Sequence, residues 1–353
     1  MTRFVPNFST NELLPPWVSI GARNWVFALK VKHKNLQGYL DSHFNCGAPD
    51  VAPFYYEAFE YPYGLLRVTK HDNFSSRHGE QSDSLGAGPG MHTLSKIDMN
   101  WAYPVQRWRV SPDNFRYDRQ VVWVEPMAFD NNSYSMFSSR EIWGTEVDMA
   151  RISLVEETHP GRLHIDVAMQ GLQTFTPKSI SHLIGVLHIE MDPEVSSDLL
   201  TELEKHPGLA EFMGVLFSSI GLKGSPNTIH NSEVNTLKQF RDVFNMQVAV
   251  YRAIIASRTN QSNVTDMVFY DGSKVELDFM WSQTMAEALN DFFDLHYQLD
   301  GKRSMGHPGG ADDIDGNKVD WSLPRLRKDV VLAASFTSDI TYDVTGTLHT
   351  YGN

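Results

Sequence analysis

Several things are scarce in this chain, and each scarcity excludes a class of protein. Among 353 residues there is one cysteine, Cys46, so an intramolecular disulfide is excluded and a reducing compartment is expected. Acidic residues outnumber basic ones, and the formal net charge of -13 argues against nucleic acid or an anionic membrane as a partner. No apolar run approaches the length of a membrane span, and no basic-then-apolar leader opens the chain. We therefore expect a cytoplasmic protein.

Apolar residues, in contrast, are plentiful. Hydrophobic residues make up 41% of the chain and aromatic residues 12%, enough for a large core. Apolar residues alternate with others over 25–31, 163–167 and 330–344, the pattern of strands with one buried face. Such alternation is typical of antiparallel sheets. The sequence thus predicts an α+β protein that is mainly antiparallel β.

One region has helical rather than alternating periodicity. From Asp192-Pro193 onward, leucine and other apolar residues recur at spacings of three and four, through Leu209, Phe212 and Leu216. We interpret about 192–245 as a helical insertion in a single domain, 1–353. Its apolar face must be buried, so we expect it to cap a pocket or to form a homo-oligomer contact.

The most informative stretch runs from Val121 to Val155. An apolar β-branched run is followed by Asn131-Asn132, which offers N-cap chemistry, and then by Met136, Arg140 and Trp143 on one helical face. Gly144 stands where a glycine commonly ends a helix, and the pattern then becomes extended again. This predicts a strand, a short helix and a second strand.

These residues resemble a segment of the acetoacetate decarboxylase family, namely Asn131-Asn132, Arg140-Glu141 and Ile142-Trp143-Gly144. The resemblance implies a closed β-barrel or cone with an internal pocket and outer helices. It ends where the family has two lysines, the first a Schiff-base nucleophile that the second activates. Counted without a gap, those positions are Val147 and Asp148, and no lysine lies between Lys96 and Lys178. The Schiff-base mechanism is therefore not expected at this position.

The resemblance also implies site residues. It places an arginine at the start of the first strand and a glutamate on the strand that contains Phe54-Tyr55-Tyr56. The acids that become candidates for proton transfer are Glu57, Glu141 and Asp148. The residues that become candidates for substrate binding are Arg23, Arg140, Trp143 and Val147. The alternative for Arg140–Glu141 is a structural ion pair that fastens the short helix to the sheet.

Three functions stay open at this point. The first is an enzyme with lyase-type chemistry on a small oxo acid or polyketide-like substrate, without a Schiff base. The second is a cyclase or aldolase-dehydratase of secondary metabolism on the same scaffold, and the third is a non-catalytic small-molecule-binding protein. In all three the partner is a small molecule. No cofactor and no metal are expected, because His71 and His78 lack a convincing ligand spacing.

Overall fold

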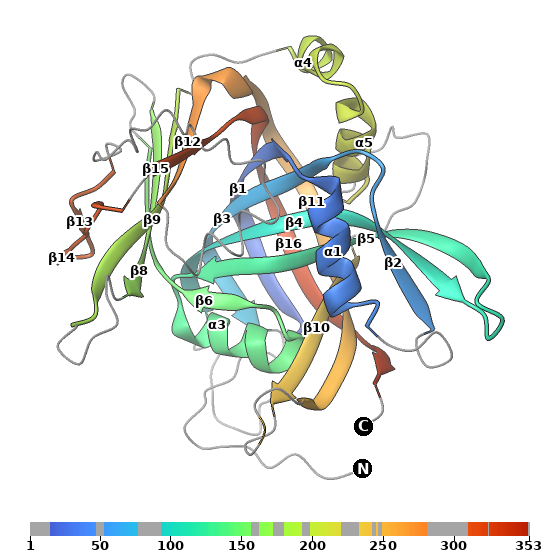
Figure 1. Ribbon diagram of the computed structural model, residues 1–353. Helices are drawn as coiled ribbons and strands as arrows, with labels where there is room; N and C mark the ends of the chain where they lie inside the picture. The colour runs from blue at the N-terminus through green and yellow to red at the C-terminus, as the bar shows by residue number, and fades with distance from the viewer. Residues whose placement is uncertain are drawn as a thin grey trace.

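The computed structural model describes residues 15–46, 53–76, 93–156, 162–171, 180–192, 198–219, 233–241, 245, 249–280, 310–323 and 325–351. Most of them lie in strands (Figure 1). The strands are β1 (Trp17–Lys30), β2 (Phe54–Ala58), β3 (Tyr63–Ser76), β4 (Thr93–Val110), β5 (Arg116–Asp130), β6 (Val147–Met149), β7 (Arg151–Glu156), β8 (Leu163–Gly171), β9 (His182–Met191), β10 (Glu233–Arg241), β11 (Ala249–Asp271), β12 (Val275–Met280), β13 (Asp313–Ile314), β14 (Asn317–Lys318), β15 (Arg325–Lys328) and β16 (Val330–Thr350). The helical elements are α1 (His33–His43), α3 (Ser133–Ser138), the π-helical turn η2 (Ser139–Trp143), α4 (Leu199–Lys205), α5 (Leu209–Ser219) and the 3₁₀ turn η3 (Gly272–Lys274).

The larger sheet is twisted and curved (Figure 1). Its nine strands follow the order β2-β4-β3-β1-β16-β11-β10-β5-β6, and β4 also pairs with β5. That extra pairing makes the hydrogen bonds run in a cycle through β4, β3, β1, β16, β11, β10 and β5. Only β5 pairs in parallel, with β10 and β6, among the described strands of this sheet. The prediction of a mainly antiparallel β protein is confirmed, and the helices among the described residues are few.

A smaller, antiparallel sheet lies at the left of Figure 1 and has the order β15-β12-β9-β8-β7. Its inner residues, including Ile165, Val167 and Ile189, share one core with the larger sheet. The rings of Trp101 and Phe279 meet across this interface at 6.3 Å between centroids. Because side chains alternate along a strand, the neighbouring residues of β8, β9 and β12 point to the opposite face.

The predicted helical insertion is shorter than expected. Helices α4 and α5 occupy 199–219, but 233–241 form strand β10, and 193–197, 220–232 and most of 242–248 lie outside the described residues. The spacing of Leu237 and Phe240 suggests a helix locally, whereas the segment pairs with β11 along its whole length. Tertiary pairing thus overrides the local pattern. Helix α5 buries Phe212 and Met213 against Val26 of the larger sheet.

The strand–helix–strand prediction for 121–155 is confirmed by β5, α3 with η2, and β6. The Asn132 side chain accepts hydrogen bonds from the backbone N–H groups of Tyr134 and Ser135. Gly144 ends the helical turn with φ +69°, and a Cβ there would lie 2.5 Å from the Lys238 backbone. Glycine is therefore required both by the backbone conformation and by the close approach of β10.

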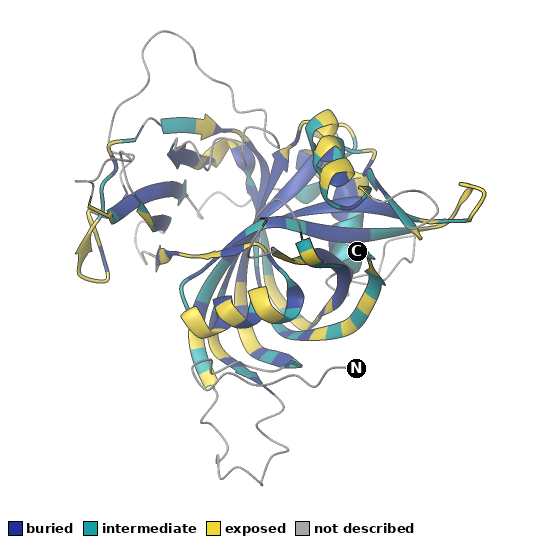
Figure 2. Cartoon of the chain, turned by 60° about the horizontal axis from the view of Figure 1, so that its bottom comes forward, coloured by how far each residue is buried: buried dark blue, intermediate teal, exposed yellow. Residues whose placement is uncertain are grey.

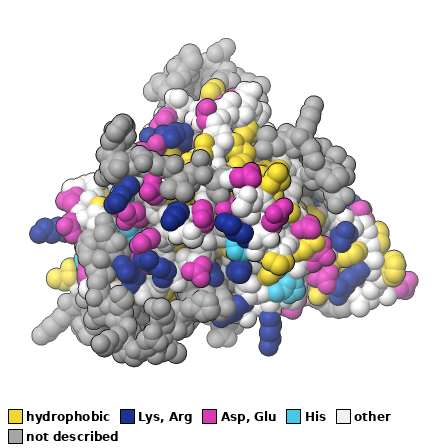
Figure 3. Space-filling view, turned by 90° about the horizontal axis from the view of Figure 1, so that it is seen from above, with side chains coloured by type: hydrophobic (Ala, Val, Ile, Leu, Met, Phe, Trp, Pro, Cys, Tyr) yellow, Lys and Arg dark blue, Asp and Glu magenta, His cyan; other side chains and the backbone are white. Residues whose placement is uncertain are grey.

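Burial and charge vary over the surface. Figure 2 shows buried residues along the strands and exposed residues at the far end of the β4–β5 hairpin, where Phe115 is 69% exposed. On the face seen in Figure 3, acidic and basic side chains are interspersed. Within the described residues, no helix has both the length and the apolar character that a membrane crossing requires.

Candidate functional site

Inside the larger sheet lies a cavity of about 60 Å³, here called the inner cavity. Its walls come from β1, β3, β4, β5, β10, β11 and β16, and from residues 139–147. Aromatic rings of Trp17, Phe74, Trp143 and Tyr342 form part of the lining, and charged groups from β3, β4 and β5 form another part, among small polar and apolar side chains. The charged residues of this lining are Arg67, Lys96, Asp98, Glu125 and Asp130.

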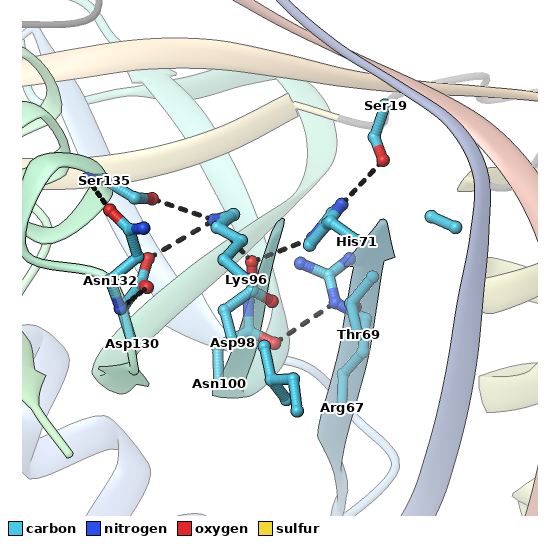
Figure 4. A network of polar contacts seen from close by, with 12 residues as sticks. Ser19, Arg67, Thr69, His71, Lys96, Asp98, Asn100, Asp130, Asn132 and Ser135 are labelled. Atoms are coloured by element: carbon cyan, nitrogen blue, oxygen red, sulfur yellow. Dashed lines mark hydrogen bonds and ion pairs between the residues drawn. The ribbon is translucent and has the colours of Figure 1, made fainter. Parts of the chain in front are cut away.

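The sheet register brings these charged residues together. Lys96 and Asp98 are two apart on β4 and share a face, and Asp98 lies opposite Asp130 of β5. The Lys96 Nζ atom lies 2.7 Å from Asp98 Oδ2 and 3.3 Å from Asp130 Oδ2, and donates to Ser135 Oγ at 2.9 Å (Figure 4). The amine also lies 4.4 Å from the centre of the Phe74 ring. Lys96 is thus a buried cation with its hydrogen bonds made.

The charges around Lys96 fix its protonation state. Burial on its own lowers the pKa of Lys96, but Asp130 and Asp98 together raise it well above its ordinary value. Burial raises the pKa of Asp130, and Lys96 only partly counters this. Asp98 differs, since Lys96 and His71 hold its pKa well below the usual range despite its burial. The difference between the carboxyls follows from the shorter Lys96 contact and the additional histidine of Asp98.

His71 extends this network away from the cavity. Its Nε2 lies 3.0 Å from Asp98 Oδ2, and its Nδ1 lies 2.8 Å from Ser19 Oγ (Figure 4). Burial lowers the pKa of His71 from 6.5, and Asp98 offsets this only in part. A carboxylate accepts, so the proton of the neutral ring belongs on Nε2, and Ser19 then donates to Nδ1. His71 therefore holds Asp98 in place for Lys96.

A second polar group also lines the inner cavity. Arg67 Nε donates to Asn100 Oδ1 at 3.1 Å, and Asn100 Nδ2 donates to Glu125 Oε1 at 2.7 Å. The contact of Arg67 with Glu125 Oε1 is longer, at 3.4 Å. Burial raises the pKa of Glu125, although Arg67 and Asn100 act in the other direction. Glu125 is therefore a carboxyl with an increased tendency to carry a proton.

A side cavity of about 40 Å³ adjoins the inner one. The two share Arg67, Glu125, Val234 and Thr259, so the arginine–glutamate pair borders both. Leu216 and Ser219 of α5 line the side cavity, which places the predicted helical region over it. This lining is otherwise mostly apolar.

Of the site residues expected from the sequence, Trp143 and Val147 line the inner cavity. The Trp143 ring stacks on Trp17 at 4.6 Å, and its buried Nε1 has no hydrogen-bond acceptor among the described residues. Val147 also lines a wider outer hollow of about 410 Å³, together with Arg140, Asp148 and Lys238.

Arg140, Glu141 and Asp148 lie outside the inner cavity. The Arg140 guanidinium is 4.0 Å from Asp148 Oδ1, and the two side chains are 55% and 58% exposed. The ion pair that links η2 to β6 therefore runs from Arg140 to Asp148 instead of to Glu141, because Asp148 stands opposite on the returning strand. The carbonyl of Glu141 accepts a hydrogen bond from Lys238 Nζ.

Arg23 and Glu57 lie apart from both cavities. Arg23 pairs with Glu156 at 2.6 Å in a half-exposed position. Glu57 accepts from Trp108 Nε1 at 3.0 Å, with a side chain that is 41% exposed. The resemblance that suggested these two residues is one of local sequence along a strand. It does not determine which face of the strand turns inward.

The charged residues of the inner cavity were not predicted from the sequence, namely Arg67, Lys96, Asp98, Glu125 and Asp130. Two local signals mark them: Lys96, Asp98 and Asn100 alternate on one strand, and Glu125 interrupts the apolar run of β5. A charge within an apolar strand is most often paired and inward-facing or at an edge. The partners themselves come from other strands and leave no local signal.

No protein-family model matches the chain, and no curated protein matches its sequence. Solved structures do match. A crystal structure of acetoacetate decarboxylase from Legionella pneumophila matches with a TM-score of 0.55 and 13% identity, covering 98% of this chain and 92% of that one. A further structure, from structural studies of acetoacetate decarboxylase, has a TM-score of 0.46 and 10% identity, covering 95% and 91%. The Legionella likeness shows that this chain has an acetoacetate decarboxylase-like fold.

Proposed function

We propose that this chain is an enzyme with lyase-type chemistry on a small oxo acid, bound in the inner cavity without a lysine Schiff base. The observation that carries the proposal is the buried Lys96, an amine held between Asp98 and Asp130. Together with the cycle of strand pairings, which we interpret as a closed barrel, this gives an internal polar site enclosed by aromatic rings.

Lys96 is suited to act as a fixed positive charge rather than as a nucleophile. A lysine must lose its proton to attack a carbonyl carbon, and its carboxylate neighbours favour the protonated form. A nucleophilic lysine would instead have a cationic neighbour, because a nearby positive charge lowers the lysine pKa and favours the neutral amine. The three N–H groups of Lys96 point to Asp98, Asp130 and Ser135, so the ammonium holds these groups at the cavity wall. Negative charge that develops on a bound oxygen is then stabilised by Arg67.

Arg67 and Glu125 supply the remaining functions. The Arg67 fork makes only a long contact to Glu125 and is suited to an oxo-acid carboxylate or enolate oxygen. When a 3-oxo acid loses carbon dioxide, the carbon–carbon bond breaks and its electron pair forms an enolate. Glu125, whose pKa is raised by burial, then donates a proton to the α-carbon, and solvent restores it. The products are carbon dioxide and a ketone.

Trp143 and Val147 have a binding role in this proposal, since both line the inner cavity. Arg140, Glu141 and Asp148 lie at or near the outer hollow, which shares Thr145 and Val147 with the inner cavity. We propose that Arg140 attracts an anionic substrate at this entrance. The expected homo-oligomer remains a prediction that sedimentation tests.

The proposal is tested by measuring carbon dioxide release from a panel of 3-oxo acids. Glu125→Gln keeps the hydrogen-bond acceptor at Oε1 but cannot donate the proton, so turnover should fall by roughly 10²–10⁴-fold. Glu57→Gln makes the same chemical change at an exposed carboxyl and should leave turnover unchanged. Absence of carbon dioxide release from every acid, or equal effects of the two variants, would contradict the proposal.

The side cavity supports a second candidate, an aldol, dehydration or cyclisation reaction on a longer oxo substrate. Its apolar lining adjoins Arg67 and Glu125, so a substrate tail placed there would keep its oxo group at the same polar pair. Incubation with polyketide-like oxo compounds distinguishes the two candidates. Loss of water or ring closure without carbon dioxide favours the second.

A further inference from the structure

The outer face of the smaller sheet carries a cluster of histidine and acidic residues. His164 and Asp166 are two apart on β8, and His188 and Glu190 are two apart on β9. The antiparallel register places His164 opposite Glu190 and Asp166 opposite His188. All of these side chains therefore leave the same face of the β8–β9 pair, opposite to the core residues Ile165 and Ile189.

The ligand atoms of this cluster are close together. One atom each from His164, His188 and Glu190 lies within 4.8 Å of the others. Tetrahedral Zn²⁺ with bonds of about 2.0–2.1 Å would bring such atoms to roughly 3.3 Å, a difference that small side-chain rotations cover. Neither cavity described above is lined by these residues.

His188 is held as a metal-ligating histidine is held. Its ring is fully buried, and its Nδ1 lies 2.6 Å from Asp166 Oδ1. The other oxygen of Asp166 accepts the N–H group of Ala311 at 2.9 Å, which fixes the carboxylate. Because Asp166 is an acceptor, the ring proton of the neutral histidine belongs on Nδ1, and Nε2 then carries the lone pair.

The Nε2 atom of His188 points to a ligand independently of the close spacing of the cluster. It is buried, and it meets no hydrogen-bond partner among the described residues. A buried polar atom without a partner destabilises the fold, so its retention requires an explanation. A metal ion bound to Nε2 removes that cost.

Nearby charged groups leave the site available. Glu190 Oε1 accepts from Arg162 at 3.2 Å, which leaves the second oxygen for a metal. Asp278, which lies opposite His188 on β12, bonds to Arg327 at 2.9 Å. The Asp278 carboxylate is thus paired with the Arg327 guanidinium and does not compete with Glu190 as a metal ligand.

We propose that His164, His188 and Glu190 bind one divalent transition-metal ion, with Asp166 orienting His188. Imidazole and carboxylate ligands suit Zn²⁺ and its neighbours rather than Ca²⁺ or Mg²⁺. Three protein ligands leave a further coordination position for water or an anionic ligand. The site is separate from the inner cavity and does not depend on the function proposed there.

The test is calorimetric titration of the full-length, tag-free chain with Zn²⁺, and Co²⁺ absorption in the visible region as a report on coordination. Wild type should bind one Zn²⁺ per chain. His164→Ala, which removes a half-buried ligand, should weaken binding at least about 100-fold, and Asp166→Asn should weaken it about 10–100-fold. His182→Ala is the matched control, since His182 starts the same strand β9 but pairs with Asp320.

Circular dichroism of each variant establishes that it is folded. Glu190→Gln is the second ligand variant, because that side chain is partly exposed and its change leaves the core intact. The proposal is overturned if folded wild type shows no Zn²⁺ binding at concentrations up to about 100 micromolar. It is also overturned if His164→Ala and Glu190→Gln bind as tightly as His182→Ala.

Discussion

The ammonium of Lys96 lies 2.7 Å from the carboxylate of Asp98, and both are on β4, facing the inner cavity. The pair is charged in the folded protein, because the pKa of the lysine is raised and that of the aspartate is lowered. A lysine at the cavity wall is thus kept in the form that cannot attack a carbonyl group.

The first prediction follows from this protonation state. Incubation with acetoacetate and borohydride should leave no reduced adduct on Lys96, because the protonated amine does not form an imine. Peptide mass spectrometry of the treated protein makes the measurement. An adduct mapped to Lys96 would show that the amine loses its proton in the complex, and would reverse the role assigned to it.

Lys96→Met should destabilise the fold. It leaves Asp98 and Asp130 buried without their cation, and breaking a buried ion pair costs about 3–5 kcal/mol. Lys70→Met is the control, because Lys70 has a longer contact of 3.8 Å with Asp72, where both side chains are well exposed. Denaturant unfolding should show a change within about 0.5 kcal/mol for the control. Equal effects would mean that the buried network contributes nothing.

His71 should make stability depend on pH. Its pKa is lowered from 6.5 by burial, so below that pH the unfolded chain takes up a proton before the folded chain does. Stability from this group is therefore present above pH 6.5 and is lost as pH falls through the lower folded pKa. Unfolding free energy measured from about pH 7 to 5 should fall more steeply in wild type than in His71→Gln, by up to about 1.4 kcal/mol per pH unit.

The exposed His33 provides the comparison, since His33→Gln changes no buried contact. Its unfolding free energy should follow the wild-type slope. Parallel slopes for wild type and His71→Gln would instead show that His71 takes up its proton equally in both states.

Comparing Gly144→Ala with Gly316→Ala should distinguish backbone strain from steric conflict. Gly144 has φ +69°, and an added Cβ would approach the Lys238 backbone to 2.5 Å. Gly316 has φ +77° with nothing within 4 Å, so Gly316→Ala adds the backbone strain alone. We expect roughly 1 kcal/mol of destabilisation for Gly316→Ala and clearly more for Gly144→Ala, measured by denaturant unfolding. Equal values would mean that β10 shifts away without cost.

The residues assigned to the site show where local reasoning works. Trp143 and Val147 belong to one stretch in which the strand, the N-cap and the terminating glycine are all indicated by neighbouring residues. Both line the inner cavity. Arg23 and Glu57 come from a likeness between strands, and they lie elsewhere because a strand pattern does not show which partner covers each face. From the sequence we expected no metal, on the spacing of His71 and His78. The cluster proposed to bind one leaves no local signal, because His164 and His188 are 24 residues apart and come together only through the β8–β9 register.

The sequence alone determined the local structure: alternation gave the strands, Asn132 and Gly144 bounded the short helix, and valine at 147 excluded a Schiff base there. Tertiary structure decided what those elements bring together. Strand β10 replaced a predicted helical end because β11 pairs with all of it. Lys96 of β4 meets Asp130 of β5, and Arg67 of β3 meets Glu125 of β5, so each pair joins two different strands. Side-chain periodicity depends on each strand alone, but a shift of one residue in register would turn every side chain to the other face, so register belongs to the assembled sheet.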